Sequence, residues 1–269
     1  MKILNGSELA GFIKERQAGQ VEYFINNKKF RPKLSIIQCV DDPVINTYVR
    51  LKKAYGEAIN IDVEDHKINQ AHAKDLILKL NNDPTVNGII IQLPIEDKNQ
   101  TDELVNLVDP KKDVDSLGVN SDYEPATPMA ILWLLAGYNI NLKDKSILLI
   151  GRGKLVGAPL EKILKKSGYK VTVADRKTDN LKDLTLVADI IITATGSPAI
   201  LYPNMVKQGV VIVDAGVASE DGKTVGDVAS EMYDRQDIVI TPTKGGVGPL
   251  TICALFENVI RAAQDTKVS

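Results

Sequence analysis

The sequence predicts an α/β protein of two domains, an upstream α/β domain followed by a domain built on a parallel sheet. Helix and strand patterns alternate through the first half of the chain, at the spacing typical of a parallel sheet with helices on both faces. This periodicity breaks between Asp109 and Pro125, which we interpret as a loop or domain crossing. From Ser146 to Asp175 the chain reads as strand, glycine turn, helix and strand ending in an acid. That layout is typical of a Rossmann-like, dinucleotide-binding βαβ unit.

The first half opens with a helix that Ser7 and Glu8 cap and that runs towards Asn26. Asp42-Pro43 begins a second helix that reaches about Ile59, because proline is favoured in the first helical turn. The remaining elements predicted here are strands over 33–40, 61–66 and 87–93 and a helix over 71–80.

The second half opens with a helix for which Thr127 and Pro128 supply the N-cap and first position. An Asp-Gly turn within 219–224 predicts a hairpin or an extended arm between Val217 and Val228. An apolar helix from Leu250 to about Ala263 follows, and we expect it to pack back on the first domain. The other predicted elements are strands over 146–150, 170–175, 188–196, 210–216 and 238–241 and a helix over 158–168.

Composition excludes several classes of protein. A formal net charge of −2 gives no reason to expect a nucleic-acid partner, and no apolar run approaches the length of a membrane span. Cys39 and Cys253 read as buried free thiols, which indicates a cytoplasmic location. His66 and His72 are the only histidines, which argues against a histidine-based triad or metal site. Proton chemistry therefore rests on lysine, tyrosine or carboxylates, and we predict no metal.

The glycine turn contains Gly151, Gly153 and Gly157, a GxGxxxG spacing. Glycine permits close approach of the backbone to a pyrophosphate, and the helix that follows offers unpaired N–H groups. A plain strand-to-helix turn would use the same residues, but the two flanking strands favour cofactor binding.

Signals for the choice of dinucleotide conflict. Asp175 lies where an acid would bind both ribose hydroxyls of NAD and repel a 2′-phosphate. Arg176 and Lys177 follow it at once, and Arg152 lies in the turn, where cations would suit the additional phosphate of NADP. All three cations could equally be solvated surface charges.

Three features of the first half carry possible chemistry. Tyr48 and Lys52 are four residues apart and share a helix face, although Tyr48, Leu51 and Tyr55 could be an ordinary apolar stripe. Gln92 ends a strand, where ligands of α/β sheets bind, although a buried, hydrogen-bonded glutamine would look the same. Asp113 and Asp115 form a DVD pair that could bind a metal but more often forms caps or turns.

Taken together, six segments resemble the bifunctional methylenetetrahydrofolate dehydrogenase/methenyltetrahydrofolate cyclohydrolase family, also called FolD. They lie in the family's order over about residues 48 to 251. The motifs YxxxK, GIxxQLPLP, PxKDVDG, PCTPxG, GRSxxVGxP and PGGVGPMT match residues 48–52, 88–95, 110–116, 125–130, 151–159 and 244–251.

The resemblance implies a folate site in which Lys52 is the catalytic cation. Tyr48 would stack on the folate and orient Lys52, Gln92 would hydrogen-bond Lys52, and Asp115 would bind the pterin ring. The remaining implied residues are Gly248 and Pro249 against the folate, and Gly151, Arg152, Gly153, Asp175, Arg176 and Val217 at the cofactor.

The resemblance also implies an activity and an organisation. The enzyme would oxidise 5,10-methylenetetrahydrofolate with NADP, NAD being possible, and hydrolyse the methenyl product to 10-formyltetrahydrofolate. It would be a cytoplasmic homodimer of one-carbon metabolism, with no nucleic-acid or membrane partner. Residues 1–120, with helix 250–269, would form the folate-binding domain, residues 121–249 the NAD(P)-binding domain, and the active-site cleft would lie between them.

Several positions depart from the family's motifs. Gly153 replaces a serine, Asp175-Arg176 replaces a His-Ser pair that the family often uses for the 2′-phosphate, and Ser116 replaces a glycine. Three other readings compete: a monofunctional NAD-dependent methylenetetrahydrofolate dehydrogenase, a shikimate dehydrogenase-like enzyme, and a regulator with a decayed site. The intact set of Lys52, Gln92 and Asp115 argues against the first and the last.

Overall fold

The structure, a computed structural model, describes residues 1–216, 218–220 and 223–265. The chain forms two compact units, each built on its own parallel sheet. The six-stranded unit contains Met1–Ala10 and Thr127–Thr251, and the three-stranded unit contains Gly11–Ala126 and the chain from Ile252 onward. Two units of α/β architecture are what the alternating patterns predicted.

The three-stranded unit contains strands in the order β3-β2-β4, all parallel. Each strand is rich in β-branched residues, as in the GIIIQ run of β4, which favours a pleated and buried segment. The elements are α1 (Gly6–Tyr23, which starts in the other unit), β2 (Lys33–Gln38), α2 (Pro43–Ala58), β3 (Asp62–Lys67), α3 (Ala73–Asn82), β4 (Gly88–Gln92) and α4 (Thr101–Leu107).

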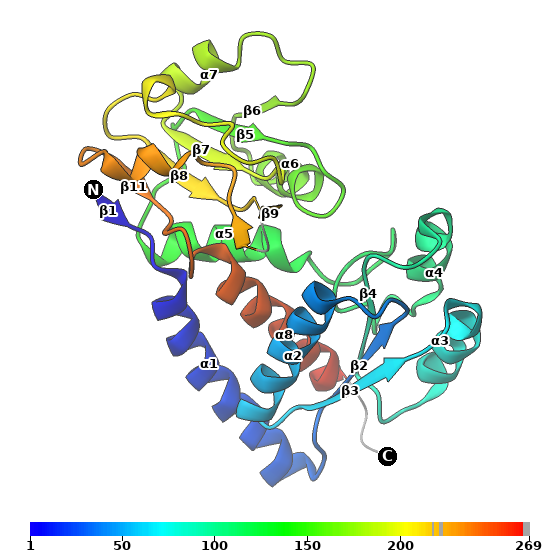
Figure 1. Cartoon of the computed structure of the whole chain (residues 1–269). Helices are drawn as coiled ribbons and strands as arrows, with labels where there is room; N and C mark the ends of the chain where they lie inside the picture. The colour runs from blue at the N-terminus through cyan, green and yellow to red at the C-terminus, as the bar shows by residue number, and fades with distance from the viewer. Residues whose placement is uncertain (217, 221–222, 266–269) are drawn as a thin grey trace. The chain divides into compact units, whose positions relative to one another are not determined.

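Helices cover both faces of this sheet (Figure 1). One face carries Ile37, Ile89 and Ile91, which form an apolar core with buried residues of α3 and α4. On the other face α2 lies close to β3, because a Cβ on Gly56 would come within 2.4 Å of Val63 Cγ2. Glycine at this position therefore lets α2 approach the sheet closely.

α2 begins as the sequence predicts. The Asp42 side chain accepts hydrogen bonds from the backbone N–H groups of Val44 at 2.8 Å and Ile45 at 3.2 Å, with Pro43 in the first turn. The buried face of the helix carries Ile45, Val49 and Gly56. Tyr48 lies outside that face, so its neighbourhood is a surface rather than a core.

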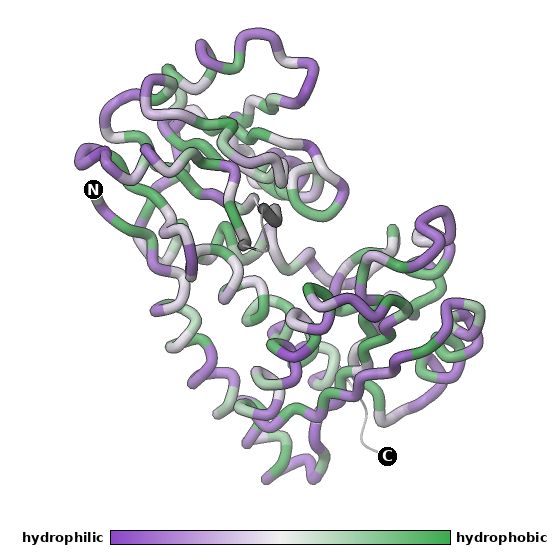
Figure 2. The backbone as a smooth tube through the Cα atoms, viewed as in Figure 1, coloured by the Kyte–Doolittle hydropathy of each residue, from purple (hydrophilic) through white to green (hydrophobic). Residues whose placement is uncertain are grey.

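The six-stranded unit has the strand order β1-β11-β8-β7-β5-β6, and every pair in it is parallel. Its central strands are buried hydrophobic runs, seen as green segments in Figure 2. The elements are β1 (Lys2–Ile3), α5 (Ala126–Gly137), β5 (Ile147–Ile150), α6 (Gly157–Lys166), β6 (Val171–Ala174), α7 (Leu181–Val187), β7 (Ile190–Thr193), β8 (Val211–Asp214), β11 (Val239–Ile240) and the start of α8 (Val247–Asp265).

A separate antiparallel pair, β9 (Ala218–Glu220) and β10 (Lys223–Val225), lies where a hairpin or arm was expected. The strands pair with Ala218 opposite Val225. The hairpin alternative is therefore the observed one. No helix within the described ranges combines the length and apolar character needed to cross a membrane.

Helix starts differ most from the sequence prediction. Asn5, rather than Ser7, accepts the hydrogen bond from the backbone N–H of Glu8, at 3.3 Å, and α1 starts at Gly6. α5 already contains Ala126, so Thr127 is inside the helix and is not its N-cap. α8 starts at Val247 rather than Leu250. The short elements β1, α4 and α7 were not predicted.

Candidate active site

Lys52 and Gln92 come together at the carboxyl edge of the three-stranded sheet. Gln92 is the last residue of β4 and is in register with Gln38, the last residue of β2. The Lys52 Nζ donates a hydrogen bond of 2.9 Å to the Gln92 Oε1. The Gln92 amide nitrogen in turn donates to the Leu93 carbonyl at 3.2 Å, which fixes the orientation of the amide. The edge where α/β sheets bind ligands thus presents an oriented lysine.

The charge of Lys52 is set by two opposing effects. Burial lowers the pKa of Lys52 below that of an ordinary lysine, since a charged ammonium loses hydration there. The negative charge of Asp115 acts in the opposite direction and raises that pKa. A lysine with a lowered pKa gives up its proton more readily than an ordinary lysine, so it can both donate and accept one, as a proton shuttle requires.

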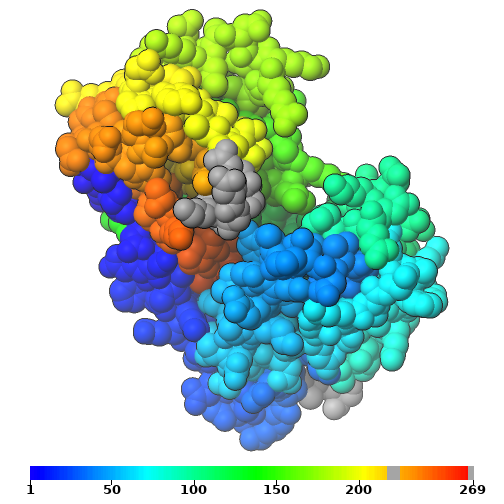
Figure 3. Space-filling model, in the orientation of Figure 1, coloured from blue at the N-terminus to red at the C-terminus, as the bar shows by residue number. Residues whose placement is uncertain are grey.

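Tyr48 lies one turn before Lys52 on the same helix face, with 41% of its surface exposed. Leu51 is likewise exposed, at 44%, and the region is part of the visible surface in Figure 3. The apolar-stripe interpretation is therefore wrong for Tyr48 and Leu51, whereas Tyr55 packs against Phe256. An exposed ring beside a lysine is suited to stacking on a flat ligand.

Asp115 lies in a loop that its neighbours hold in shape. The buried Asp113 carboxylate accepts backbone hydrogen bonds from Gly118 at 2.8 Å and Leu117 at 3.3 Å, and burial raises the pKa of Asp113 to about 6. Ser116 adopts a φ of 56° and donates from its hydroxyl to the Tyr123 carbonyl at 2.7 Å. Serine thus takes the left-handed conformation that favours glycine, the residue that the family has at this position.

The two acids of this loop have different surroundings. Asp113 is used internally, as a turn former, whereas the Asp115 carboxylate has no hydrogen bond or ion pair within residues 1–216, 218–220 and 223–265. Within the same ranges, no group of three His, Cys, Asp or Glu side chains is placed to hold a metal ion. Asp115 is therefore the acid that is available to a ligand.

The glycine turn of the six-stranded unit follows β5. Gly151 has a φ of 103°, and a Cβ there would lie 2.5 Å from the Ala194 carbonyl oxygen. A Cβ on Gly157 would lie 2.1 Å from the Gly151 carbonyl oxygen. Both glycines are required by the fold itself. A Cβ on Gly153 would meet nothing within 4 Å, so this side of the turn has space for a ligand.

Arg152 leaves this turn towards α6. Its Nε donates a hydrogen bond of 2.8 Å to Glu161 Oε2, while Lys165 Nζ lies 2.6 Å from the other oxygen, Glu161 Oε1. The hydrogen bond from Lys165 and the one from Arg152 hold the pKa of Glu161 below its usual range. Arg152 is thus held by an ionised carboxylate rather than free in solvent.

Asp175, Arg176 and Lys177 follow β6 at the edge where Gly151 follows β5. The two strands are in register at Ile150 and Ala174, and the Gly151 N–H donates to the Ala174 carbonyl at 2.8 Å. The Asp175 Oδ1 accepts from the Lys177 N–H at 2.8 Å, closing a turn. Asp175 therefore shapes the loop that displays Arg176, and all three residues are exposed.

The remaining site residues named from the sequence are less informative. Gly248 and Pro249 lie in the first turn of α8, and a Cβ on Gly248 would meet nothing within 4 Å. Val217 lies outside the residues that the structure describes.

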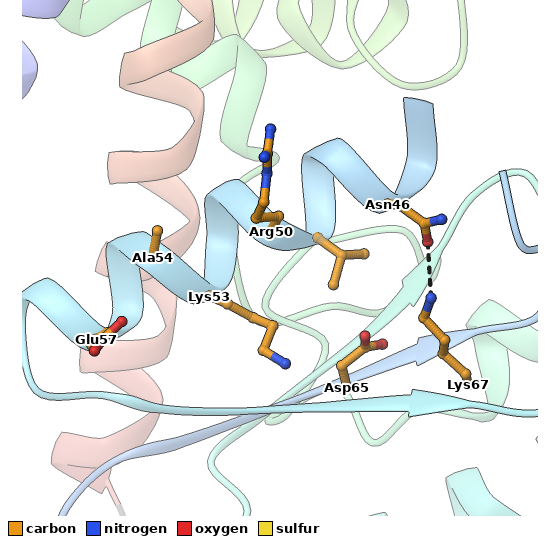
Figure 4. Close-up of a pocket in the computed structure, with 8 residues that line it drawn as sticks. Asn46, Arg50, Lys53, Ala54, Glu57, Asp65 and Lys67 are labelled. Carbon is orange, nitrogen blue, oxygen red and sulfur yellow. Dashed lines mark hydrogen bonds between the residues drawn. The ribbon is translucent and has the colours of Figure 1, made fainter. Parts of the chain in front are cut away.

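A hollow on the surface of the three-stranded unit is formed by other residues. It has a volume of about 360 Å³ and lies between α2 and β3, on the helix face that carries Arg50 and Lys53 (Figure 4). Asp65 and Lys67 of β3 face it, and the Lys67 Nζ donates to the Asn46 Oδ1 at 3.2 Å. Lys52 points from a different face of α2, so we assign no role in the chemistry to this hollow.

Sequence models of the tetrahydrofolate dehydrogenase/cyclohydrolase family match the chain in two parts. The catalytic domain of that family matches residues 4–115, and its NAD(P)-binding domain matches residues 125–267. The chain belongs to this family.

Individual members agree with that assignment over nearly the full length. The bifunctional protein FolD of Lactobacillus acidophilus is 39% identical, covering 97% of this chain and 96% of the relative. The crystal structure of the bifunctional FolD enzyme from Campylobacter jejuni gives a TM-score of 0.92 at 35% identity, covering 98% of this chain and 99% of the other. A Trypanosoma brucei FolD structure, complexed with NADP cofactor and an inhibitor, gives 0.91 at 25% identity, with 99% and 98% covered.

The family comparisons confirm the predicted resemblance, the two-domain α/β fold, and an enzyme with dehydrogenase and cyclohydrolase activities. They also confirm that this member of the tetrahydrofolate dehydrogenase/cyclohydrolase family has an NAD(P)-binding domain. The roles of individual residues stay predictions.

One residue in contact with the glycine turn was not predicted from the sequence. Glu161 accepts a hydrogen bond from Arg152. The sequence feature that could have revealed it is an acid that directly follows Leu160 and precedes Leu164 by one turn, on the apolar side of α6. All three residues are buried in α6, whereas an acid without a partner would be expected on the exposed side of the helix.

Proposed function

We propose that this protein oxidises 5,10-methylenetetrahydrofolate to the methenyl form with NADP⁺ and then hydrolyses the methenyl form to 10-formyltetrahydrofolate. The observation that carries the second reaction is the hydrogen bond of 2.9 Å between Lys52 and Gln92, with Asp115 close enough to act on the lysine charge. A dehydrogenase alone would need no such proton-transfer group, because hydride transfer requires placement rather than acid–base help.

We propose that Lys52 moves the proton in the hydrolysis. Water adds to the methenyl carbon and loses one proton; the carbon–N5 bond then breaks as N5 takes up a proton and the hydroxyl on the carbon loses its proton to become the formyl carbonyl. The net products are 10-formyltetrahydrofolate and one proton. A lysine with a lowered pKa can accept the proton from water as the neutral amine and return it to N5. Gln92 keeps Nζ in place by accepting one of its hydrogens.

Folate binding rests on Asp115 and Tyr48 in this proposal. The Asp115 carboxylate has both oxygens available, and a pterin ring presents amino and amide N–H groups that suit a carboxylate acceptor. Tyr48 offers an exposed ring on which the flat folate can stack, and Gly248 and Pro249 contact the folate as the family resemblance implies.

Cofactor binding rests on the glycine turn and its cations. The backbone at Gly151 and Gly153 accepts close approach of a diphosphate, and Gly153 leaves the necessary space. Arg152 and Arg176 follow neighbouring strand ends and are suited to a 2′-phosphate, which favours NADP over NAD. NADP⁺, when bound, accepts the hydride from the methylene carbon. NADP in the Trypanosoma brucei FolD structure supports the same choice.

We further propose that the three-stranded unit is the folate-binding catalytic domain and the six-stranded unit the NAD(P)-binding domain. The matched ranges 4–115 and 125–267 support this division. A cytoplasmic homodimer, with tetrahydrofolate derivatives as substrates, is the organisation that the family resemblance implies. Cys39 and Cys253 are buried thiols that form no disulfide, which is compatible with a reducing compartment.

The test is a steady-state assay of purified protein with methylenetetrahydrofolate and either NADP⁺ or NAD⁺, followed by hydrolysis of the methenyl form without dinucleotide. We expect activity in both assays and a higher kcat/KM with NADP⁺ than with NAD⁺. Oxidation without methenyl hydrolysis would contradict the bifunctional assignment, and a higher kcat/KM with NAD⁺ would contradict the cofactor assignment.

A further inference from the structure

Glu161 occupies an unusual position for an acid. It lies on the buried side of α6 with Gly157, Leu160 and Leu164, and only 9% of its side chain is exposed. Burial of a carboxylate is unfavourable unless cations and hydrogen bonds compensate for it. Here both oxygens are used, Oε2 by Arg152 and Oε1 by Lys165.

The bond to Arg152 uses one particular atom of the guanidinium. Nε donates to Glu161 at 2.8 Å, while within the described ranges no partner is recorded for the two terminal nitrogens. The Arg152 side chain remains 60% exposed. A carboxylate that holds Nε therefore fixes the plane of the guanidinium and leaves its terminal N–H groups for an anion, which arginine binds in a bidentate manner.

The position of Arg152, just after β5, indicates which anion it would bind. α6 packs on both β5 and β6, and Arg152 and Arg176 each stand two residues beyond the aligned pair Ile150 and Ala174. In dinucleotide-binding folds the acid at the end of the second strand marks the adenosine ribose. Arg152 and Arg176 thus follow the ends of neighbouring strands, at the edge of the sheet where the ribose of the cofactor would lie.

An ordinary helix pair does not account for this arrangement. Glu161 and Lys165 are four residues apart and would form an ion pair on any exposed helix face. Such a pair gains little from burial of the acid. The contact that needs Glu161 in its buried position is the one to Arg152, nine residues away along the chain.

We propose that Glu161 is a positioning residue for cofactor choice: it holds Arg152 so that its free N–H groups meet the 2′-phosphate of NADP. The proposal rests on NADP use by this enzyme, as proposed above. Glu161 itself touches no substrate and acts only through Arg152. Its loss should lower the preference for the 2′-phosphate and leave folate binding unchanged.

The experiment uses two cofactor fragments, 2′,5′-ADP and 5′-AMP, which differ at the 2′-phosphate. Their Kd values are measured by calorimetry for the full-length wild type, Glu161→Ala, Glu161→Gln and Lys165→Met, with thermal unfolding as a check of folding. Wild type should bind 2′,5′-ADP more tightly. Glu161→Ala should reduce the ratio of the two Kd values about 3- to 10-fold, the factor expected when a long side chain must be ordered on binding.

Two variants separate positioning from general structure. Lys165→Met removes the other partner of Glu161 and should keep the wild-type ratio. Glu161→Gln keeps an acceptor for Arg152 Nε and should reduce the ratio less than alanine does. In an Arg152→Ala background, Glu161→Gln should have no further effect on the ratio.

Each contrary result has its own meaning. A wild-type ratio in folded Glu161→Ala would overturn the role of Glu161, as would a further loss from Glu161→Gln in the Arg152→Ala background. If Glu161→Ala does not fold, the role of Glu161 is decided by comparing Arg152→Ala with the double variant that also carries Glu161→Gln. Equal affinity of the wild type for both fragments would overturn the NADP assignment, and the positioning role with it.

Discussion

Lys52 Nζ donates a hydrogen bond of 2.9 Å to Gln92 Oε1, although the two residues are 40 positions apart in the chain. The bond joins the middle of α2 to the carboxyl end of β4. Gln92 is itself held through its amide nitrogen by the Leu93 carbonyl, so the lysine is oriented by the sheet. This geometry makes Lys52 distinguishable from the lysine beside it.

The first prediction concerns that difference. Lys52→Met should lower kcat for methenyl hydrolysis by about 100-fold or more, the range typical of removing a general acid–base group. Lys53→Met is a matched control, since Lys53 points into the hollow between α2 and β3 and has no part in the proposed chemistry. The kcat for methenyl hydrolysis is measured for both variants at pH 7. An equal loss in the two would show that charge on α2, and not Lys52, matters.

The second prediction concerns the pH dependence of hydrolysis. Asp115 raises the pKa of Lys52, while burial lowers it. Asp115→Asn removes the negative charge, so the lysine should lose its proton at a lower pH, and the acidic limb of the kcat profile, where activity rises as the neutral amine forms, should move to lower pH. The exposed Asp122→Asn serves as control and should leave the profile in place. A profile of Asp115→Asn that moves to higher pH would contradict the assigned coupling.

The central elements of the fold could be predicted because local signals and tertiary environment agree. The buried run of β4 and the Asp42-Pro43 start of α2 are such cases. β1 contains two residues, Lys2 and Ile3, which become a strand only by pairing with Val239 and Ile240 of β11, 237 residues later. Periodicity cannot reveal a strand of this length. The cap of α1 is Asn5 rather than Ser7, an error of two residues between two good capping types.

The site could be predicted in its residue types and, through the family resemblance, in one contact. Family motifs pointed to Lys52, Gln92 and Asp115 and implied a hydrogen bond between the first two, which the structure contains. The contact between Arg152 and Glu161 could not be predicted from spacing, because nine residues that include a turn and a helix start separate them. Such a contact depends on where the turn directs the arginine side chain.

The third prediction addresses cofactor choice at the second cation. Arg176→Ser should weaken NADP⁺ binding by about 10-fold and NAD⁺ binding much less, because a charge-assisted bond to the 2′-phosphate is lost. Lys170→Ser, an exposed lysine just before β6, should affect neither. Fluorescence titration gives the two dissociation constants, for NADP⁺ and for NAD⁺, of each variant and of the wild type. Equal weakening of both cofactors would show that Arg176 does not read the phosphate.

The last prediction concerns the loop that carries Asp115. Ser116 has a φ of 56° and a hydroxyl that donates to the Tyr123 carbonyl at 2.7 Å. Ser116→Ala loses that bond and keeps the left-handed strain, so it should lower the free energy of unfolding by about 1 kcal/mol. Ser116→Gly loses the same bond but relieves a strain of about 1 kcal/mol, so it should remain close to wild type.

Urea denaturation of both Ser116 variants measures the difference directly. Because both variants lack the hydroxyl, the difference between them measures the cost of the left-handed backbone conformation and not the loss of the hydrogen bond. If the alanine variant were as stable as the glycine variant, the left-handed conformation at Ser116 would carry no cost. Folate affinity should follow the same order, since the backbone at Ser116 determines the direction in which the neighbouring Asp115 is presented.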